Sequence, residues 1–325
     1  MSMKKIVIAG GCFWGVEAYF KLIPGIKKTR VGYANSKVTN PTYEEVCSGH
    51  TNAVEAVILE YNPKVITLEK ILHYLFRIID PTSLNKQGGD KGTQYRTGVY
   101  YFKDDDKETI SHALKELQKE YTTKVVVENT KLVNFYDAEL YHQDYLTKNP
   151  YGYCHVNLYD LKPEERKVNK KKIYGELLSN VEVLFNNDSH TLSVLSNVSA
   201  LLKEKFKDIS WVGFYLDDGQ ELFLGPFQGK VACEKIKYHQ GVCGHAYTTK
   251  QSVIVPDVHE FPGHIACDDS TNSELVLPVY DENNTLFAVL DIDSYRYDYF
   301  DEEDERYLKA LLEIIKKYLR KGEIL

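Results

Sequence analysis

The chain loses its regular pattern of apolar residues between positions 160 and 172, where lysine and glutamate become frequent. Such an interruption in a chain of 325 residues indicates two domains of ordinary size joined by a charged linker. We expect a first domain over residues 1–160, a linker over 161–175 and a second domain over 176–325. No internal repeat relates the two halves.

The composition argues against several classes of protein. A net charge of −7 disfavours nucleic acid or an anionic membrane as the main partner, and no stretch has the length and apolarity of a membrane span. We expect a cytoplasmic protein, in which cysteines are buried residues, metal ligands or redox catalysts rather than a disulfide framework. The chain has six: Cys12, Cys47, Cys154, Cys233, Cys243 and Cys267.

Strands and helices alternate in the first half. Apolar runs and period-two alternation predict strands, whereas apolar residues at helical spacing predict helices. The expected strands are 4–9, 29–33, 53–61, 97–102 and 124–128, and the expected helices are 12–22, 68–79 and 104–121. This βαββαβ order with additions is typical of a ferredoxin-like α/β sandwich in the α+β class.

The second half begins and ends with helices and has strands between them. The expected helices are 174–185, 189–206 and 302–320. The expected strands are 210–216, 221–227, 252–255, 274–280 and 285–292. This order predicts an antiparallel sheet with flanking helices.

One string in the first half lies where the first strand gives way to a helix: Gly11-Cys12-Phe13-Trp14-Gly15. A cysteine at a helix N-terminus faces unpaired N–H groups and the positive end of the dipole, which lower its pKa and favour the thiolate. Phe13 and Trp14 would form an apolar wall for a methyl or thioether group. The alternative is a structural cysteine among core aromatic residues, but the flanking glycines favour a reactive thiol.

Several polar loops of the first half are candidates for the rest of a site, because such loops often carry function. They contain Tyr33, Glu45, Asp90 and Tyr95. Taken singly, each of these is more typical of an ordinary turn or surface. Cys154 follows in a loop marked by glycine and proline, where a mobile second thiol could serve a disulfide-forming cycle.

Together these strings resemble peptide methionine sulfoxide reductase of type A (MsrA) over roughly residues 4–155. The Gly-Cys-Phe-Trp-Gly string is a specific marker of that family, and Gly-Thr-Gln-Tyr-Arg and Asn-Pro-Tyr-Gly-Tyr-Cys reinforce it. The resemblance implies that Cys12 attacks the sulfoxide sulfur and becomes a sulfenic acid. Cys154 then attacks it, forming a disulfide that thioredoxin reduces.

The resemblance also implies roles for the other candidates. Phe13 and Trp14 would hold the S-methyl group, and Asp90 would give polar support. The sulfoxide oxygen would be protonated by Glu45, helped by Tyr33 and Tyr95.

The chain departs from the family pattern in two places. The family often has Gly-His-Ala-Glu where this chain reads Asn52-Ala53-Val54-Glu55, so any role of that histidine is absent. The tail offers only one resolving thiol. Cys47 matches a family position but has no necessary role, and we interpret it as a core residue.

The second half has its own thiols, aromatic residues and acids. Its cysteines are separated by 9 and 23 residues, and without a Cys-x₂₋₄-Cys pair a structural zinc site is disfavoured. We expect no metal. Asp291 and Asp293 share one face of a strand by period two, a pattern that by itself indicates solvated acids at a strand end.

This half resembles the GAF-type free methionine-(R)-sulfoxide reductases over about residues 180–320, because all three family cysteines occur in matching strings. The resemblance implies that Cys267 is the attacking thiol, that Cys233 is its disulfide partner and that Cys243 lies in the site. The residues expected to contact the substrate are Trp211 and Tyr215 at its methyl end and Glu274, Asp291 and Asp293 at its amino group and sulfoxide.

Two hypotheses from different classes follow. The first is a bifunctional reductase without bound cofactor, which acts on oxidised proteins or peptides and on free methionine sulfoxide. Its reductant would be thioredoxin, which draws indirectly on NADPH. The second makes the C-terminal half a ligand- or redox-sensing GAF module without catalysis. The three cysteines favour the enzyme, because a sensor needs no such set.

Overall fold

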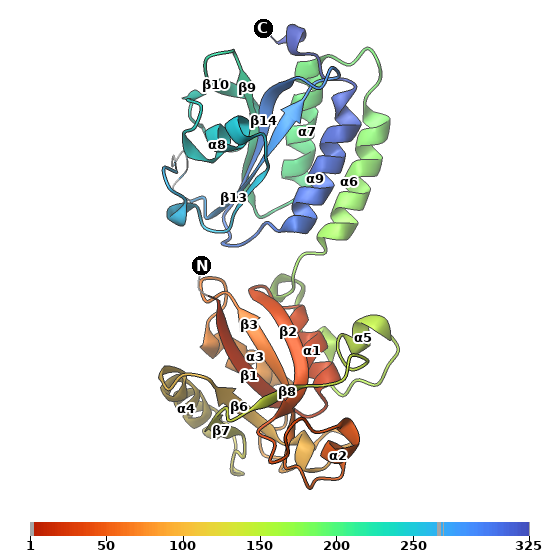
Figure 1. Ribbon diagram of the computed structural model, residues 1–325, viewed down its shortest axis with the longest axis vertical. Coiled ribbons are helices and arrows are strands. Elements are labelled where there is room, and N and C mark those ends of the chain that lie inside the picture. Colours follow the sequence, from red (N-terminus) through yellow and green to blue (C-terminus); the bar gives the residue numbers. More distant parts are fainter. Residues whose placement is uncertain (1–2, 265–267, 269, 325) are drawn as a thin grey trace. The chain divides into compact units, whose positions relative to one another are not determined.

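The computed structural model describes residues 3–264, 268 and 270–324. The chain forms two compact units, Met1–Lys167 and Val168–Leu325 (Figure 1). Within the described residues, no helix is long and apolar enough to cross a membrane.

The N-terminal unit is built on a six-stranded sheet in the order β7-β6-β1-β3-β2-β8. The strands are β1 Lys4–Gly10, β2 Ile26–Ala34, β3 Val54–Tyr61, β6 Thr97–Tyr101, β7 Glu128–Lys131 and β8 Phe135–Asp137. Four of them, in the order β6-β1-β3-β2, form the antiparallel sheet of a ferredoxin-like fold, and β7 extends it in parallel to β6. The predicted fold class is confirmed, although β7 starts only at Glu128 because residues 124–127 do not pair.

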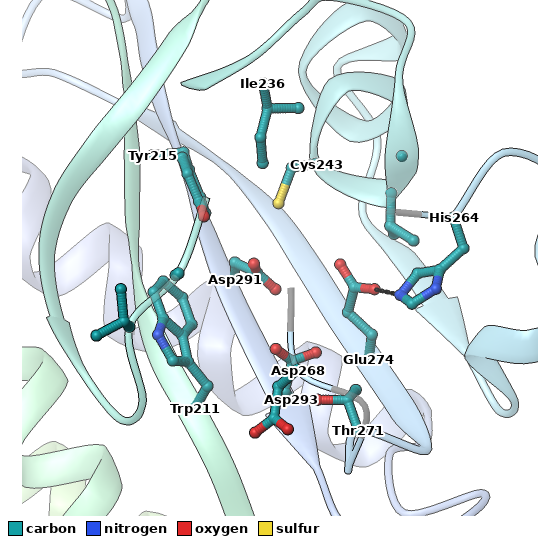
Figure 2. Close-up of a pocket in the computed structure, with 14 residues that line it drawn as sticks. Trp211, Tyr215, Ile236, Cys243, His264, Asp268, Thr271, Glu274, Asp291 and Asp293 are labelled. Atoms are coloured by element: carbon teal, nitrogen blue, oxygen red, sulfur yellow. Dashed lines mark ion pairs between the residues drawn. The ribbon is translucent and has the colours of Figure 1, made fainter. Parts of the chain in front are cut away.

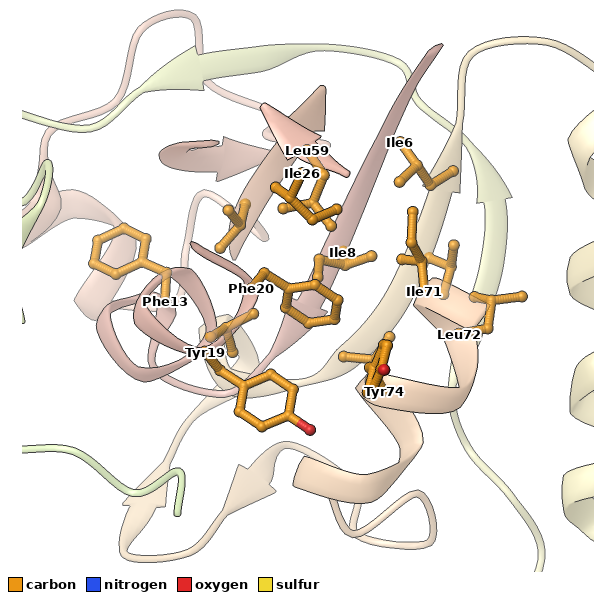
Figure 3. Packing of buried hydrophobic residues seen from close by; sticks show 14 of the residues in the cluster. Ile6, Ile8, Phe13, Tyr19, Phe20, Ile26, Leu59, Ile71, Leu72 and Tyr74 are labelled. Atoms are coloured by element: carbon orange, nitrogen blue, oxygen red, sulfur yellow. The ribbon is translucent and has the colours of Figure 1, made fainter. Parts of the chain in front are cut away.

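Helices cover one face of this sheet. They are α1 Phe13–Lys21, α3 Leu68–Ile78 and α4 Asp105–Gln118. Alternate residues of β1, Ile6 and Ile8, pack against Phe20 of α1 and Ile71 of α3 in a shared core, as Figure 3 shows. The opposite face carries a smaller cluster around Val7 and the other outward-facing apolar residues of the sheet. Helix α1 is thereby fixed at the end of β1, where the first site lies.

Residues just before the boundary between the units pack on the N-terminal unit. Arg77 of α3 donates to both carboxylate oxygens of Glu165, at 2.9 and 3.2 Å, and Leu161 is buried. Just after it, α6 begins at Lys170, whose ammonium group contacts Asp304 at 2.5 Å. Much of the segment expected to be a linker, 161–175, is therefore ordered against one unit or the other.

The C-terminal unit has a fully antiparallel sheet in the order β11-β10-β9-β14-β13-β12. Its strands are β9 Ile209–Asp217, β10 Leu222–Gln228, β11 Lys235–Ile236, β12 Val253–Val255, β13 Ser273–Tyr280 and β14 Leu286–Ser294. One face packs on α7 Thr191–Lys205 and α9 Glu302–Lys316, and α6 Lys170–Leu184 packs on these two helices. Helix α8 Gly241–Thr249 lies on the other face (Figure 1). The predicted antiparallel sheet with flanking helices is confirmed.

Candidate active sites

Cys12 lies at the junction of β1 and α1. The preceding Gly11 has a φ of +87°, and a Cβ atom on it would lie 2.6 Å from Cβ of Gln87, so the turn requires glycine. Cys12 is the N-cap residue of α1, and its side chain is 6% exposed. The turn therefore places a nearly buried thiol at the N-terminal end of a helix.

The surroundings of Cys12 keep its thiol protonated. Burial raises its pKa far above the usual value and the Glu55 carboxyl raises it further, whereas the backbone N–H groups of Trp14 and Gly15 lower it. The expectation of a lowered pKa is wrong for this structure, because desolvation outweighs the helix N-terminus. The thiolate form of Cys12 is therefore disfavoured in this environment.

Glu55 of β3 is the carboxyl group beside Cys12. It lies opposite Tyr33 in the β2–β3 register, is 1% exposed and accepts a hydrogen bond from the Phe13 amide at 3.2 Å. Burial raises the pKa of Glu55 to about 8, although the Phe13 N–H opposes the shift. At neutral pH Glu55 is mostly a carboxylic acid and can donate a proton.

Two tyrosines share the environment of Glu55. Tyr43 belongs to the short helix α2 Tyr43–Cys47, and Tyr95 ends a 3₁₀ turn. Burial raises the pKa of both phenols, the charge of Glu55 raises it further, and the two side chains are hydrogen-bonded. Tyr33 differs, since its hydroxyl donates to Glu139 at 2.7 Å. Tyr43 was not among the residues predicted from the sequence.

Glu45 does not join this group. It caps α2: the Thr42 N–H donates to Glu45 Oε2 at 2.9 Å, and the Glu45 N–H donates to Thr42 Oγ1 at 3.3 Å. This reciprocal capping box holds the carboxylate at the start of the helix. The expectation for Glu45 is therefore corrected, because the carboxyl group beside Cys12 is Glu55. Cys47 is exposed, so its interpretation as a core residue is wrong.

Aromatic rings form one wall beside Cys12. Trp14 stacks on Tyr145 of the short helix α5 Tyr145–Lys148, with ring centroids 3.8 Å apart. The Trp14 Nε1–H donates to His142 Nδ1 at 3.1 Å. Phe13 lies 5.2 Å from the His142 ring and 6.1 Å from the ring of Tyr33. These contacts hold Phe13 and Trp14 in place, and these are the two side chains expected to contact the S-methyl group of the substrate.

Cys154 lies close to the first turn of α1. Its Sγ is 3.1 Å from the position that a Cβ on Gly15 would take. Two residues later Val156 is buried in the core, and His155 Nε2 is 2.9 Å from the carbonyl oxygen of Gly10. The tail thus passes the helix start that Cys12 caps.

Asp90, in the short strand β5 Asp90–Lys91, faces the same tail. It accepts a hydrogen bond from the Tyr153 hydroxyl at 3.1 Å, and His155 Nδ1 is 4.0 Å away. Its charge contributes to the raised pKa of Cys12 and of Glu55. Asp90 therefore belongs to the polar surroundings of both groups.

A second group of candidates lies in rows across the C-terminal sheet. In one row, Asp293 of β14 lies opposite Trp211 of β9 on one side and opposite Glu274 of β13 on the other. Because side chains alternate along strands, the row that lies two residues further along each strand faces the same side of the sheet. It consists of Gly213, Asp291 and Val276. Figure 2 shows Asp291 and Glu274 near Cys243 of α8, with Asp293 farther from it along the same pocket.

The three carboxyl groups lie in a buried pocket, and their pKa values are raised mainly by burial. Those of Glu274 and Asp293 rise well above the usual range, and the charge of Asp291 adds to both shifts. The pKa of Asp291 rises only to about 6, because Cys243 and Glu274 form hydrogen bonds with it. At neutral pH the negative charge rests mainly on Asp291. The interpretation as solvated acids is wrong.

Trp211 and Tyr215 form the aromatic side of this pocket. Their rings lie 5.9 Å apart at 25°, and Trp211 also stacks on Phe227 at 5.3 Å. The Tyr215 hydroxyl donates to the carbonyl oxygen of Cys233 at 3.0 Å. Cys233 forms a disulfide. Cys267, the expected attacking thiol, lies outside the described residues.

The family model for peptide methionine sulfoxide reductase matches residues 4–175, more than half of the chain. The chain belongs to the peptide methionine sulfoxide reductase family. An MsrA of Mycoplasma genitalium is 57% identical over 154 residues, which are 47% of this chain and 98% of that protein. The expectation that the chain is a methionine sulfoxide reductase is confirmed.

The C-terminal half of this reductase matches a GAF domain model over residues 192–319. A solved free methionine-R-sulfoxide reductase of Neisseria meningitidis with its substrate is 39% identical, covering 48% of this chain and 93% of that one, with a TM-score of 0.45. A GAF sensor protein of Burkholderia vietnamiensis, described as putative, is also 39% identical, covering 47% and 96%, with a TM-score of 0.45. The predicted fusion of a peptide methionine sulfoxide reductase with a GAF domain is confirmed.

Proposed function

We propose that the chain carries two methionine sulfoxide reductase sites for opposite sulfoxide epimers. Residues 1–160 act on the S epimer, peptide-bound or free, and residues 176–325 act on the free R epimer. The juxtaposition of Cys12 with the protonated Glu55 supports the first assignment most directly. Sulfoxide sulfur is chiral and each reductase takes one epimer, so two unrelated sites on one chain complement each other.

At the first site, Glu55 transfers its proton to the sulfoxide oxygen while Cys12 attacks sulfur, with Tyr43 and Tyr95 as additional hydrogen-bond donors. Phe13 and Trp14 hold the methyl group. The attack forms a bond between Cys12 Sγ and the substrate sulfur, and the thiol proton passes to Glu55. The protonated oxygen then moves from the substrate sulfur to Cys12 Sγ, as the S–O bond and the new S–S bond both break. The balance is thiol plus sulfoxide to sulfenic acid plus thioether. Proton donation matters because a bare oxide leaves poorly.

The sulfenic acid at Cys12 is then attacked by Cys154, which forms a disulfide and releases water. Thioredoxin reduces this disulfide, and NADPH supplies its electrons indirectly. The position of Cys154 beside the first turn of α1 supports this step. No bound cofactor takes part.

At the second site, Cys267 attacks the sulfoxide and Cys233 is its disulfide partner. Trp211 and Tyr215 hold the methyl end, and Cys243 lies among the acids. The free amino group of the substrate is a cation, and the charge on Asp291, with Glu274 and Asp293 as neighbours, attracts it. An internal peptide residue has no such ammonium group, so the site prefers the free amino acid.

A sensing role for the C-terminal unit is the second candidate, favoured by the GAF domain match. The pocket distinguishes the two, because Cys243 and the disulfide at Cys233 equip it for redox chemistry.

The test is methionine release from four substrates: the S and R sulfoxides, each free and within an N-acetylated peptide. Cys12→Ser should abolish both S activities and leave free R reduction intact, and Cys267→Ser should do the reverse. Reduction of peptide-bound R sulfoxide by the C-terminal site would contradict the free-substrate assignment. If the C-terminal unit reduces no R sulfoxide at all, the result would support its sensing role instead.

A further inference from the structure

Cys243, Glu274 and Asp291 form a compact buried group whose thiol sulfur and carboxylate oxygens lie within 4.8 Å of one another. Asp291 is 7% exposed, and its Oδ1 has no hydrogen-bond partner among the residues that the structure describes. Figure 2 shows the three side chains directed into one space. An unpaired buried acceptor is costly, and a bound cation would satisfy it.

We propose that Cys243, Glu274 and Asp291 bind a divalent cation of the zinc type. Mg²⁺ and Ca²⁺ take oxygen ligands, whereas Zn²⁺ binds thiolate and carboxylate together. Three anionic ligands more than balance its charge. The ion replaces the protons of the Cys243 thiol and the Glu274 carboxyl, which are released to solvent.

The geometry requires only a small closure of the side chains. Zinc bonds of about 2.3 Å to sulfur and about 2.0–2.2 Å to oxygen place tetrahedral ligands roughly 3.5 Å apart. The sulfur of Cys243 and the carboxylate oxygens of Glu274 and Asp291 now lie up to 4.8 Å apart. They would therefore have to approach one another by roughly 1 Å to bind the ion. The Glu274 side chain, whose Oε2 atom lies 3.8 Å from His264 Nε2, would have to rotate toward Cys243 to supply this closure.

The oxidation state of the pocket suits this ion. Cys243 is a free thiol while Cys233 is held in a disulfide, so the cation does not depend on the Cys233 thiol. The proposed ligands include two of the acids assigned to the substrate's ammonium group. If the proposed function holds, the cation and the free amino acid exclude each other.

Cobalt(II) is the probe, because thiolate coordination gives it an intense charge-transfer absorption. The parent is the oxidised full-length chain with Cys12→Ser, Cys47→Ser and Cys154→Ser, which leaves Cys243 as the free thiol among the described cysteines. We expect a cobalt–thiolate band that Zn²⁺ abolishes. Adding Cys243→Ser should remove the band. Glu274→Gln and Asp291→Asn should weaken binding by more than about tenfold, since even outer-shell partners contribute about 10–100-fold.

Glu303→Gln is the matched control, because this exposed acid lies on α9 of the same unit, and it should leave cobalt affinity unchanged. Thermal unfolding of each variant distinguishes lost ligation from lost folding, and the two carboxyl variants test the site if Cys243→Ser does not fold. A parent without the band, or unchanged affinity in a folded Cys243→Ser variant, would overturn the proposal. The measurement uses no substrate, so its outcome is independent of the proposed reductase activity.

Discussion

The Phe13 backbone amide donates a hydrogen bond to the Glu55 carboxyl at 3.2 Å, which ties the first residue of α1 to β3, a middle strand of the N-terminal sheet. The bond fixes a buried acid beside the thiol of Cys12, the preceding residue. Burial of both groups keeps both protonated near neutral pH. In the proposed mechanism the substrate therefore meets a neutral thiol and a neutral acid, and proton transfer accompanies the attack on sulfur.

Substitution of Glu55 tests this arrangement directly. Glu55→Gln should slow single-turnover reduction of methionine-S-sulfoxide by about 10²–10⁴-fold, the usual contribution of a positioned general acid. Glu45→Gln is the matched control, because Glu45 caps α2 and should leave the rate close to that of the parent. Methionine formed per chain is measured by quenched flow. Equal losses in both variants would show that the acid has been assigned to the wrong residue.

The same acid predicts the pH dependence of the first site. The reactive form of Glu55 is protonated, and its pKa is raised to about 8. Single-turnover reduction of the S epimer should therefore be fastest below this value and fall as the pH rises through it. Glu55→Gln should lose this step in the profile. A rate that increases steadily through pH 8 would instead indicate that ionisation of the Cys12 thiol limits the reaction.

The sequence predicted the first site only in part. Alternating apolar residues and helical spacing were sufficient for the ferredoxin-like sheet, and two glycines marked the strand-to-helix turn at Cys12. Glu45 was selected because it lies in a polar loop, yet its carboxylate is used by a helix cap. The usable signal was Glu55 itself, a carboxylate among the apolar residues at the start of strand β3. Its contact with α1 joins residues 42 positions apart, which spacing alone does not reveal.

In the second site, the period-two spacing of Asp291 and Asp293 correctly placed both on one face of a strand. Their burial was not predictable from that spacing, because it depends on α8 covering the sheet. Helix α8 itself was not predicted, since its sequence contains two glycines and several polar residues without a clear apolar stripe. Cross-strand pairing with Glu274 and Trp211 depends on register, which only the structure supplies.

Removal of Cys154 separates attack from recycling. In a Cys267→Ser background, Cys154→Ser should still form one methionine per chain from the S epimer and then stop, because Cys12 sulfenic acid has no resolving thiol. The background without the Cys154 change should turn over repeatedly with thioredoxin. Mass spectrometry of the stalled protein identifies the oxidised Cys12. Sustained thioredoxin-driven turnover of the double variant would exclude Cys154 as the resolving residue.

Gly213 is predicted to be required for the aromatic side of the second pocket. A Cβ on it would collide with Phe227 and lie 2.7 Å from Trp211 Cη2, so Gly213→Ala should lower the free energy of unfolding by about 1–3 kcal/mol. Gly175→Ala is the control, because its Cβ would meet nothing within 4 Å on helix α6. Alanine at position 175 should raise the free energy of unfolding by about 0.5–1 kcal/mol. Chemical denaturation measures both, and a neutral Gly213→Ala would contradict the packing argument.

The two sites should respond to pH in opposite directions. The ammonium group of the free substrate needs an ionised partner, and Asp291 has a pKa raised to about 6. As the pH falls through this value Asp291 becomes neutral, so the KM for free methionine-R-sulfoxide should rise, whereas protonated Glu55 keeps the first site active. Asp291→Asn should raise this KM at neutral pH and remove its pH dependence near 6. Initial rates for both epimers on the same preparation provide an internal control, and a KM for the R epimer that stays constant from pH 7 to about pH 5, well below the shifted pKa, would contradict the role of Asp291.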